Sequence, residues 1–86
     1  MEIKYHRKFI KELDKLNYLE RDKIDKTISI FTQNPFDYRL RNHALNGFMS
    51  DRRSIWVDFK TRIIFREFEN YTLVIFLEFG GHGQVY

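Results

Sequence analysis

Two histidines and a closing tyrosine are the side chains of this chain best suited to moving a proton. His82 stands between glycines in the final stretch "GGHGQVY", and Tyr86 is the last residue. Histidine exchanges a proton near neutral pH, and the glycines give the backbone freedom to bring it across a neighbouring strand. His43 lies in an irregular stretch that holds "RNHALNG". His6 has no motif around it and is interpreted as an ordinary surface histidine.

Positive charge gathers in the middle of the chain. Fifteen Lys and Arg residues stand against twelve Asp and Glu, for a net charge of +3. The stretch from position 38 to 66 holds only two acidic residues beside Arg39, Arg41, Arg52, Arg53, Lys60, Arg62 and Arg66. This surplus favours an acidic partner such as nucleic acid. The alternative is the solvated face of a small domain.

Length and composition predict one folded domain over residues 1–86. The chain is 43% hydrophobic with nine Phe, which is too rich in apolar side chains for a disordered protein. Without cysteine it has no disulfide and no thiolate metal site. No apolar run approaches the roughly 18 residues of a membrane span, and the first residues lack a signal peptide's apolar core. We expect a cytoplasmic protein with no metal, cofactor or membrane partner.

Apolar spacing predicts a short first strand followed by two helices. The segment "EIKYH" alternates weakly, and "HRKFIKELDKL" then places apolar side chains at helical spacing: Phe9, Ile10, Leu13 and Leu16. We expect this helix to end at Asn17. The second helix, "LERDKIDKTISIFTQ", carries Ile24, Ile28 and Phe31 on one stripe and stops before Pro35. The short link between them predicts an antiparallel helical hairpin.

Beyond position 52 the apolar period changes to two, which predicts three antiparallel strands in "RRSIWVDF", "TRIIFREFE" and "YTLVIFLEFG". We expect the helices to cover the face that carries Ile55, Val57, Ile63, Phe65, Leu73, Ile75 and Leu77. The chain is therefore predicted to be an α+β protein, with a short first strand and a helical hairpin packed on one face of a twisted antiparallel sheet.

Matching the apolar faces of the strands places Arg62 between Asp58 and Glu78 on the uncovered face. One interpretation is a cross-strand ion-pair ladder that contributes a few tenths of a kcal/mol per pair. The other is an arginine oriented toward an anion, on a face that also exposes Trp56, Ile64, Phe68, Val74 and Phe76. Such a face suits stacked bases and a phosphate, and a partner polypeptide would also fit it.

These features together resemble the RelE/ParE superfamily of toxins from bacterial type II toxin-antitoxin pairs, nearest to the YafQ and YoeB branches. The resemblance covers nearly the whole chain and implies the RelE-like microbial RNase fold. "NHALNG" is similar to the YafQ loop that carries a histidine, here His43. "RIIF" resembles the strand that carries the RelE and YoeB arginine, here Arg62. "GHGQVY" is similar to the YafQ ending, so it assigns functional roles to His82 and Tyr86.

The resemblance implies a metal-independent, ribosome-dependent mRNA endoribonuclease that directs the RNA's own 2'-hydroxyl at the adjacent phosphate. It implies His82 as general acid, His43 as base or phosphate orienter and Arg62 as transition-state clamp, with the acid and the base exchangeable. Tyr86 would stack on a base or orient the 2'-hydroxyl. The expected RNA contacts are Arg41, Arg52, Arg53, Trp56, Lys60 and Arg66. The implied partners are a cognate antitoxin, mRNA and the ribosomal A site.

The chain departs from the YafQ pattern at two places. Trp56 stands where YafQ-like toxins carry a further histidine, and Lys60-Thr61 replaces an Asp-Trp pair. Asp58 is then the candidate for the missing acidic role. The departures also favour two alternatives: a ParE-like toxin that binds DNA gyrase without cutting nucleic acid, and a catalytically degenerate toxin that binds only its antitoxin. The pair of histidines with Arg62 favours the enzyme, because a binding module has no need of it.

Overall fold

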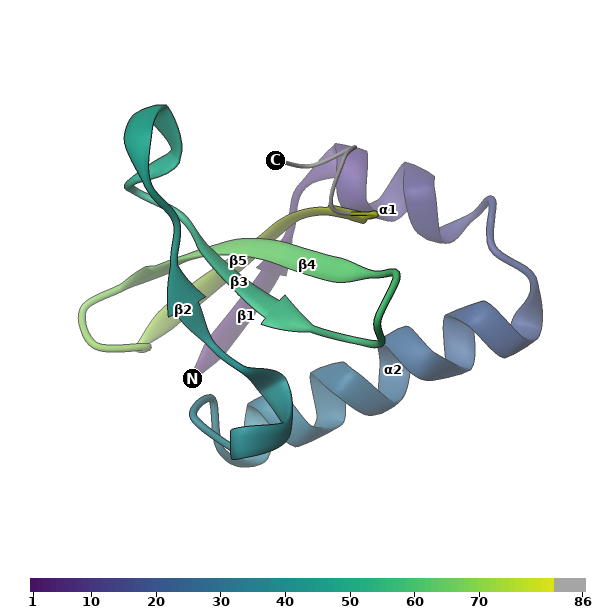
Figure 1. Ribbon diagram of the computed structural model, residues 1–86, viewed down its shortest axis with the longest axis horizontal. Helices are drawn as coiled ribbons and strands as arrows, with labels where there is room; N and C mark the ends of the chain where they lie inside the picture. The colour runs from purple at the N-terminus through teal and green to yellow at the C-terminus, as the bar shows by residue number, and fades with distance from the viewer. Residues whose placement is uncertain (82–86) are drawn as a thin grey trace.

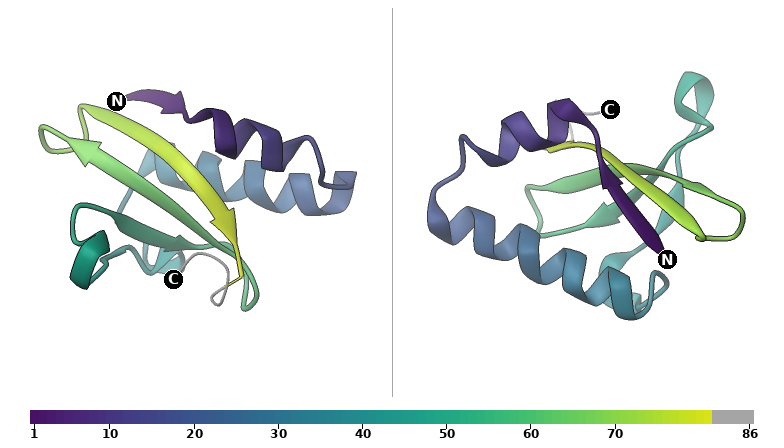
Figure 2. Two further views of the ribbon diagram at one scale, coloured as in Figure 1. Left: turned by 90° about the horizontal axis from the view of Figure 1, so that it is seen from above. Right: turned by 180° about the vertical axis from the view of Figure 1, so that it is seen from behind.

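The computed structural model describes residues 1–81, which form one sheet with both helices on the same side (Figures 1 and 2). The elements follow in the order β1 (Glu2–Tyr5), α1 (Arg7–Leu13), α2 (Tyr18–Gln33), the 3₁₀ helix η1 (Tyr38–Leu40), β2 (His43–Ala44), the 3₁₀ helix η2 (Gly47–Met49), β3 (Arg53–Trp56), β4 (Arg62–Phe68) and β5 (Leu73–Gly80). The strand order is β1-β5-β4-β3-β2. This arrangement confirms the predicted α+β class.

Helix α2 begins and ends where local sequence chemistry directs. The Asn17 side chain accepts the backbone N–H of Glu20 at 2.9 Å, and the Glu20 carboxylate accepts the backbone N–H of Asn17 at 3.2 Å. This reciprocal pair is a capping box, so Asn17 starts the second helix rather than ending the first. The helix ends at Gln33, before the Asn34-Pro35 step, as predicted.

Helix α1 is shorter than the sequence indicates and buries less of its predicted stripe. It ends at Leu13, and Phe9 is its buried residue. Ile10, which we expected on the apolar stripe, is 47% exposed. Leu13 and Leu16 are partly buried and pack against the core.

The sheet is mixed because the first strand pairs in parallel. β3, β4 and β5 form the predicted antiparallel meander. β1 lies parallel to β5, with Glu2 opposite Leu73 and Tyr5 opposite Phe76. The chain between these two strands runs through both helices and through β2, β3 and β4, which provides the long connection that a parallel pair requires. The short strand β2, which the sequence did not indicate, pairs antiparallel with β3 at the other edge.

A shift of register between β4 and β5 corrects the predicted faces of the last strand. Ile64 lies opposite Glu78, whereas Phe65 lies opposite Phe76, so β5 holds one extra residue at Leu77. Val74 and Phe76, expected on the uncovered face, are therefore buried in the helix-side core, where we had expected Leu73, Ile75 and Leu77. The run "LVIFL" is apolar on both faces, so its alternation could not identify the buried one.

The main core is a set of phenylalanines between the helices and the sheet. The ring centroid of Phe31 lies 5.1 Å from that of Phe65 and 5.4 Å from that of Phe76. The centroids of Phe9 and Phe76 are 5.7 Å apart. A second, smaller cluster joins Met49 of η2 to Ile64, with Leu45 and Leu77 packed against them. Ile64 is thus fully buried rather than exposed as predicted, because the β2–β3 connection covers that part of the sheet.

Candidate functional site

Three side chains line up on the sheet face turned away from α1 and α2, here called the open face. Trp56 of β3 lies opposite Arg62 of β4. The Arg62 Cζ lies 5.9 Å from the centroid of the Trp56 ring, and the Arg41 Cζ lies 4.8 Å from it. We call Arg41, Trp56 and Arg62 the arginine–tryptophan row. Two cations beside one indole offer charge for a phosphate and an aromatic surface for a base.

Arg62 is held by backbone oxygens and not by the predicted carboxylates. Its Nη1 donates to the carbonyl of Asp58 at 2.6 Å and to that of Thr61 at 3.3 Å. Within residues 1–81 no carboxylate forms an ion pair with Arg62. Since a guanidinium has five N–H donors, these contacts orient the side chain and leave donors for an anion.

His43 lies next to this row, and a backbone contact determines which of its ring nitrogens carries the proton. It lies opposite Ser54, two residues along β3 from Trp56. Its Nδ1 is 2.8 Å from the backbone carbonyl of Arg41. We assign the proton to Nδ1, because a carbonyl oxygen only accepts. In this tautomer the Nε2 atom carries the lone pair of the ring, and this atom is suited to accepting a proton.

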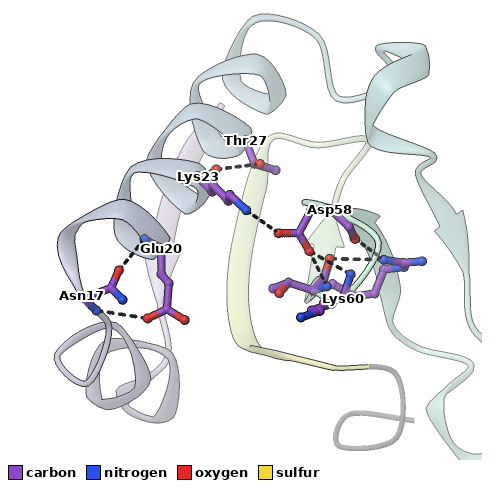
Figure 3. A network of polar contacts seen from close by, with 8 residues as sticks. Asn17, Glu20, Lys23, Thr27, Asp58 and Lys60 are labelled. Atoms are coloured by element: carbon purple, nitrogen blue, oxygen red, sulfur yellow. Dashed lines mark hydrogen bonds and ion pairs between the residues drawn. The ribbon is translucent and has the colours of Figure 1, made fainter.

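Asp58 caps the β3–β4 turn and does not face Arg62 with its carboxylate. Its Oδ1 accepts the backbone N–H groups of Lys60 at 2.8 Å and Thr61 at 2.9 Å. Its Oδ2 pairs with Lys23 of α2 at 3.2 Å (Figure 3). Burial opposes ionisation, but the Lys60 N–H and the Lys23 ammonium outweigh it and hold the pKa of Asp58 below its ordinary value. These contacts occupy both carboxylate oxygens, so Asp58 serves the turn.

Glu78, the second carboxylate predicted beside Arg62, is instead paired near the start of α1. The bulge places it opposite Ile64. Its Oε1 lies 2.7 Å from Lys8 Nζ, and its Oε2 lies 3.8 Å from Arg52 Nη1. The hydrogen bond to Glu78 raises the pKa of Lys8. The predicted ladder of Asp58, Arg62 and Glu78 is therefore wrong, because Trp56 of β3 and Gly80 of β5 lie opposite Arg62.

The other basic residues expected to contact RNA occupy three separate places. Arg52 and Arg66 both form ion pairs with Asp51, with their Nε atoms 3.8 and 3.5 Å from its carboxylate oxygens. Asp51 lies shortly after η2 in the chain. Lys60 lies on the β3–β4 turn with its Nζ 5.6 Å from the centroid of the Phe59 ring. Arg53 donates from Nε to Asn42 Oδ1 at 2.9 Å. Of the predicted RNA contacts, the structure brings only Arg41 and Trp56 next to Arg62.

His82 and Tyr86 lie outside the described residues, so their predicted roles stay predictions. Among residues 1–81 no group of three or more His, Cys, Asp or Glu side chains is placed to hold a metal ion. In that same part of the chain, no helix combines the length and the apolar character needed to cross a membrane.

A cleft of about 610 Å³ lies away from the open face, between the helices and the β3–β4 turn. Its walls alternate in charge, with Glu12 and Glu20 among Lys15, Lys23 and Lys60. Burial raises the pKa of Glu12. This mixture selects no single class of ligand, so the concentration of cations and aromatic surface on the open face marks the better candidate site.

Asn42 is a polar residue of the site that we did not single out in the sequence. It stands between Arg41 and His43 in "RNHALNG", and its side chain contacts Pro35, Tyr71 and Arg53. Its position between Arg41 and His43 was the feature of the sequence that could have indicated a role in the site. The partners lie 7, 29 and 11 residues away, so no local pattern reveals them.

Comparison with known proteins identifies the fold. No protein-family model matches the chain, and no curated protein matches it. Among solved structures, YafQ from E. coli strain BL21(DE3) is 17% identical, with 99% of this chain and 97% of that chain covered and a TM-score of 0.81. The YoeB/ParE toxin from Agrobacterium tumefaciens is 15% identical, with 95% and 99% covered and a TM-score of 0.79.

The E. coli DinJ-YafQ toxin-antitoxin complex also matches, at 17% identity, with 99% of this chain and 96% of that chain covered and a TM-score of 0.79. Each alignment spans nearly the whole of both chains. At these identities the likeness establishes the fold, and the RelE-like fold predicted from the sequence is confirmed.

Proposed function

We propose that this chain, which has the fold of the RelE/ParE toxins, is the toxin of a type II toxin-antitoxin pair and cleaves mRNA on the ribosome in the cytoplasm. The reaction uses no metal. The RNA 2'-oxygen attacks the adjacent phosphorus, and the bond from phosphorus to the 5'-oxygen breaks. The products are a 2',3'-cyclic phosphate on one fragment and a 5'-hydroxyl on the other.

The observation that carries this proposal is the arginine–tryptophan row beside His43 on the open face. Arg62 lies over Trp56 with its guanidinium oriented by the carbonyls of the β3–β4 turn. A positioned cation stabilises the negative charge that develops on a phosphorane, and an indole stacks on a base. The unprotonated Nε2 of His43 takes the proton from the 2'-hydroxyl.

The remaining roles rest on the resemblance in the sequence. His82 gives a proton to the leaving 5'-oxygen, and Tyr86 stacks on a base or orients the 2'-hydroxyl. The roles of His43 and His82 are exchangeable in this scheme. Asp58 is not assigned a proton, because its two oxygens are engaged by Lys23 and by the N–H groups of the turn.

A cognate antitoxin is the expected protein partner. A chain of the same fold is found in the DinJ-YafQ toxin-antitoxin complex. The antitoxin segment would order on binding and cover the basic open face. It would thereby compete with RNA for the same cations.

A non-catalytic toxin that binds a protein such as DNA gyrase is the second candidate. Two large aromatic side chains project from connections at opposite ends of β3: Phe48 is 91% exposed on η2, and Phe59 is 79% exposed on the β3–β4 turn. Exposed aromatic side chains are common anchors in protein interfaces. A catalytically degenerate toxin that binds only its antitoxin would use the same surface.

The test adds the purified protein to a reconstituted translation reaction and maps new mRNA ends. Matched reactions contain His43→Ala, His82→Ala or no ribosomes. Cuts in the ribosomal A site that disappear in all three controls support the proposal. Translation that proceeds without cuts contradicts it, and a DNA supercoiling assay then tests the gyrase-binding alternative.

A further inference from the structure

The side chain of Asn42 is bonded on three sides by residues from three different parts of the fold. Its Nδ2 donates to the Pro35 carbonyl at 3.0 Å and to the Tyr71 hydroxyl at 3.0 Å, and its Oδ1 accepts from Arg53 Nε at 2.9 Å. These residues belong to the connection after α2, the β4–β5 turn and β3. We call Pro35, Asn42, Arg53 and Tyr71 the Asn42 hub.

The hub fixes the backbone from which two site residues project. Asn42 directly follows Arg41, whose guanidinium lies over Trp56, and directly precedes His43, whose Nδ1 contacts the Arg41 carbonyl. The strand that carries His43 is only two residues long, so its ladder gives little restraint. The hub supplies that restraint from the helix side, where Tyr71 packs against the main core.

The β4–β5 turn brings Tyr71 to this point in a conformation that ordinary residues avoid. Glu69, Asn70 and Tyr71 have φ values of 50°, 56° and 68°, three successive left-handed residues without a glycine. Backbone strain of this kind persists where surrounding contacts enforce it, and it gathers at functional sites. The contacts here are the Tyr71 N–H donated to Glu67 Oε2 at 2.9 Å and the Tyr71 ring 5.2 Å from Phe36.

We infer that the Asn42 hub is a positioning device for the site on the open face, and that Asn42 and Tyr71 are positioning residues for Arg41 and His43. The hub holds the Arg41 carbonyl where it accepts the Nδ1 proton of His43. This keeps the lone pair on Nε2, the atom that takes a proton in the reaction. The inference rests on the proposed function for its purpose, but its structural consequence is measurable without RNA.

The first test measures the protonated ring nitrogen of His43 in the full-length, ¹⁵N-labelled protein by long-range ¹H–¹⁵N NMR. The buffer is alkaline, so that the imidazoles are neutral, and a His43→Gln sample assigns the signal. Tyr71→Phe removes one hydroxyl and keeps the ring. Tyr18→Phe is the matched control, because Tyr18 is 81% exposed on α2. We expect the Nδ1–H tautomer in the wild type and in Tyr18→Phe, and a mixture of both tautomers in Tyr71→Phe.

Asn42→Asp gives an independent variant, since it keeps the acceptor for Arg53 and loses both donated hydrogen bonds. Thermal unfolding identifies a variant that no longer folds. If either folded variant retains the wild-type proportion of the Nδ1–H tautomer, the inference is overturned. If both folded variants lose it, the inference is supported.

Cleavage in the translation reaction separates this inference from the proposed function. We expect kcat to fall about tenfold or more in Tyr71→Phe with KM little changed, because misplaced catalytic groups slow the chemical step more than binding. If the wild type cleaves mRNA and Tyr71→Phe cleaves it at the same rate, the inference is overturned and the proposed function stands. A changed tautomer in a protein whose wild type never cuts RNA supports the hub and overturns the proposed function.

Discussion

Arg62 contacts Asp58 through the backbone carbonyl of Asp58, at 2.6 Å from its Nη1, while the Asp58 carboxylate pairs with Lys23. One turn thus joins α2 to the arginine of the candidate site. The carboxylate shapes the turn, and the turn presents carbonyls that orient the guanidinium. Within residues 1–81 no carboxylate neutralises the Arg62 guanidinium, so its positive charge is available to a phosphate.

Arg62→Ala should lower mRNA cleavage at least about 100-fold, since it removes the cation aimed at the developing phosphorane charge. It should lower the free energy of unfolding by only about 1 kcal/mol, because the half-buried side chain donates to two carbonyls that water can then reach. End mapping and thermal melting measure the two effects. Arg62→Lys retains charge without the planar fork and should recover only part of the rate. A fully active Arg62→Ala protein would remove the clamp from the mechanism.

Asp58→Asn should lower stability at neutral pH and match the wild type in acid. The folded-state pKa of Asp58 lies below its ordinary value of 3.8, so the charged form stabilises the protein above that pH. This contribution disappears as the pH falls through the folded-state pKa. Urea unfolding from about pH 6 to about pH 2 should show a difference of about 1 kcal/mol that vanishes at the acid end.

Glu12, whose pKa is raised by burial, changes stability in the opposite direction with pH. It is present in both the wild type and Asp58→Asn, so its effect cancels in their difference. A difference that stays constant over the whole range would show that the charge of Asp58 contributes nothing to the fold.

Arg41→Ala should weaken binding of an RNA oligonucleotide blocked by 2'-O-methylation and reduce its salt dependence. Loss of one phosphate contact lowers the slope of log K against log salt by about 0.7 for a single strand. Arg39→Ala is the matched control, because Arg39 is bound by Asp37 through both Nε and Nη2. Fluorescence anisotropy at several salt concentrations measures the slope. Equal slopes for Arg41→Ala and the wild type would exclude a phosphate contact by Arg41.

Trp56→Ala should weaken binding of the same oligonucleotide by about 1–3 kcal/mol, the usual cost of losing one base stack. Trp56→Phe keeps an aromatic face and should recover most of the affinity. The same anisotropy assay compares them. If alanine and phenylalanine variants bind equally well, Trp56 does not stack on RNA.

Phe76→Ala should destabilise the protein by about 3–5 kcal/mol, because Phe76 is fully buried among core phenylalanines. Ile75→Ala, one residue earlier on the opposite face, should cost about 1 kcal/mol. Urea unfolding of both variants tests the face assignment that the β-bulge imposes. The reverse order would restore the register expected from the sequence.

Part of the site followed from the sequence because its signals are local. The change of period after position 52 placed Trp56 and Arg62 on the face away from the helices, and their pairing agrees with it. The second helix was readable from the stripe of Ile24 and Phe31 and from the stop before Pro35, since helical spacing and the restriction before proline act over a few residues.

Local patterns in the sequence specify the α+β class, the end of α2 at Gln33 and the face that carries Arg62. The partners of Arg62, the buried face of Val74 and Phe76, and the Asn42 hub depend instead on contacts made in the folded chain. An apolar run such as "LVIFL" satisfies either face equally, so packing against the helices selects the bulge and, with it, the position of Glu78. Hydrogen bonds such as that from Asn42 to Tyr71, 29 residues away, form only when the folded chain brings them together.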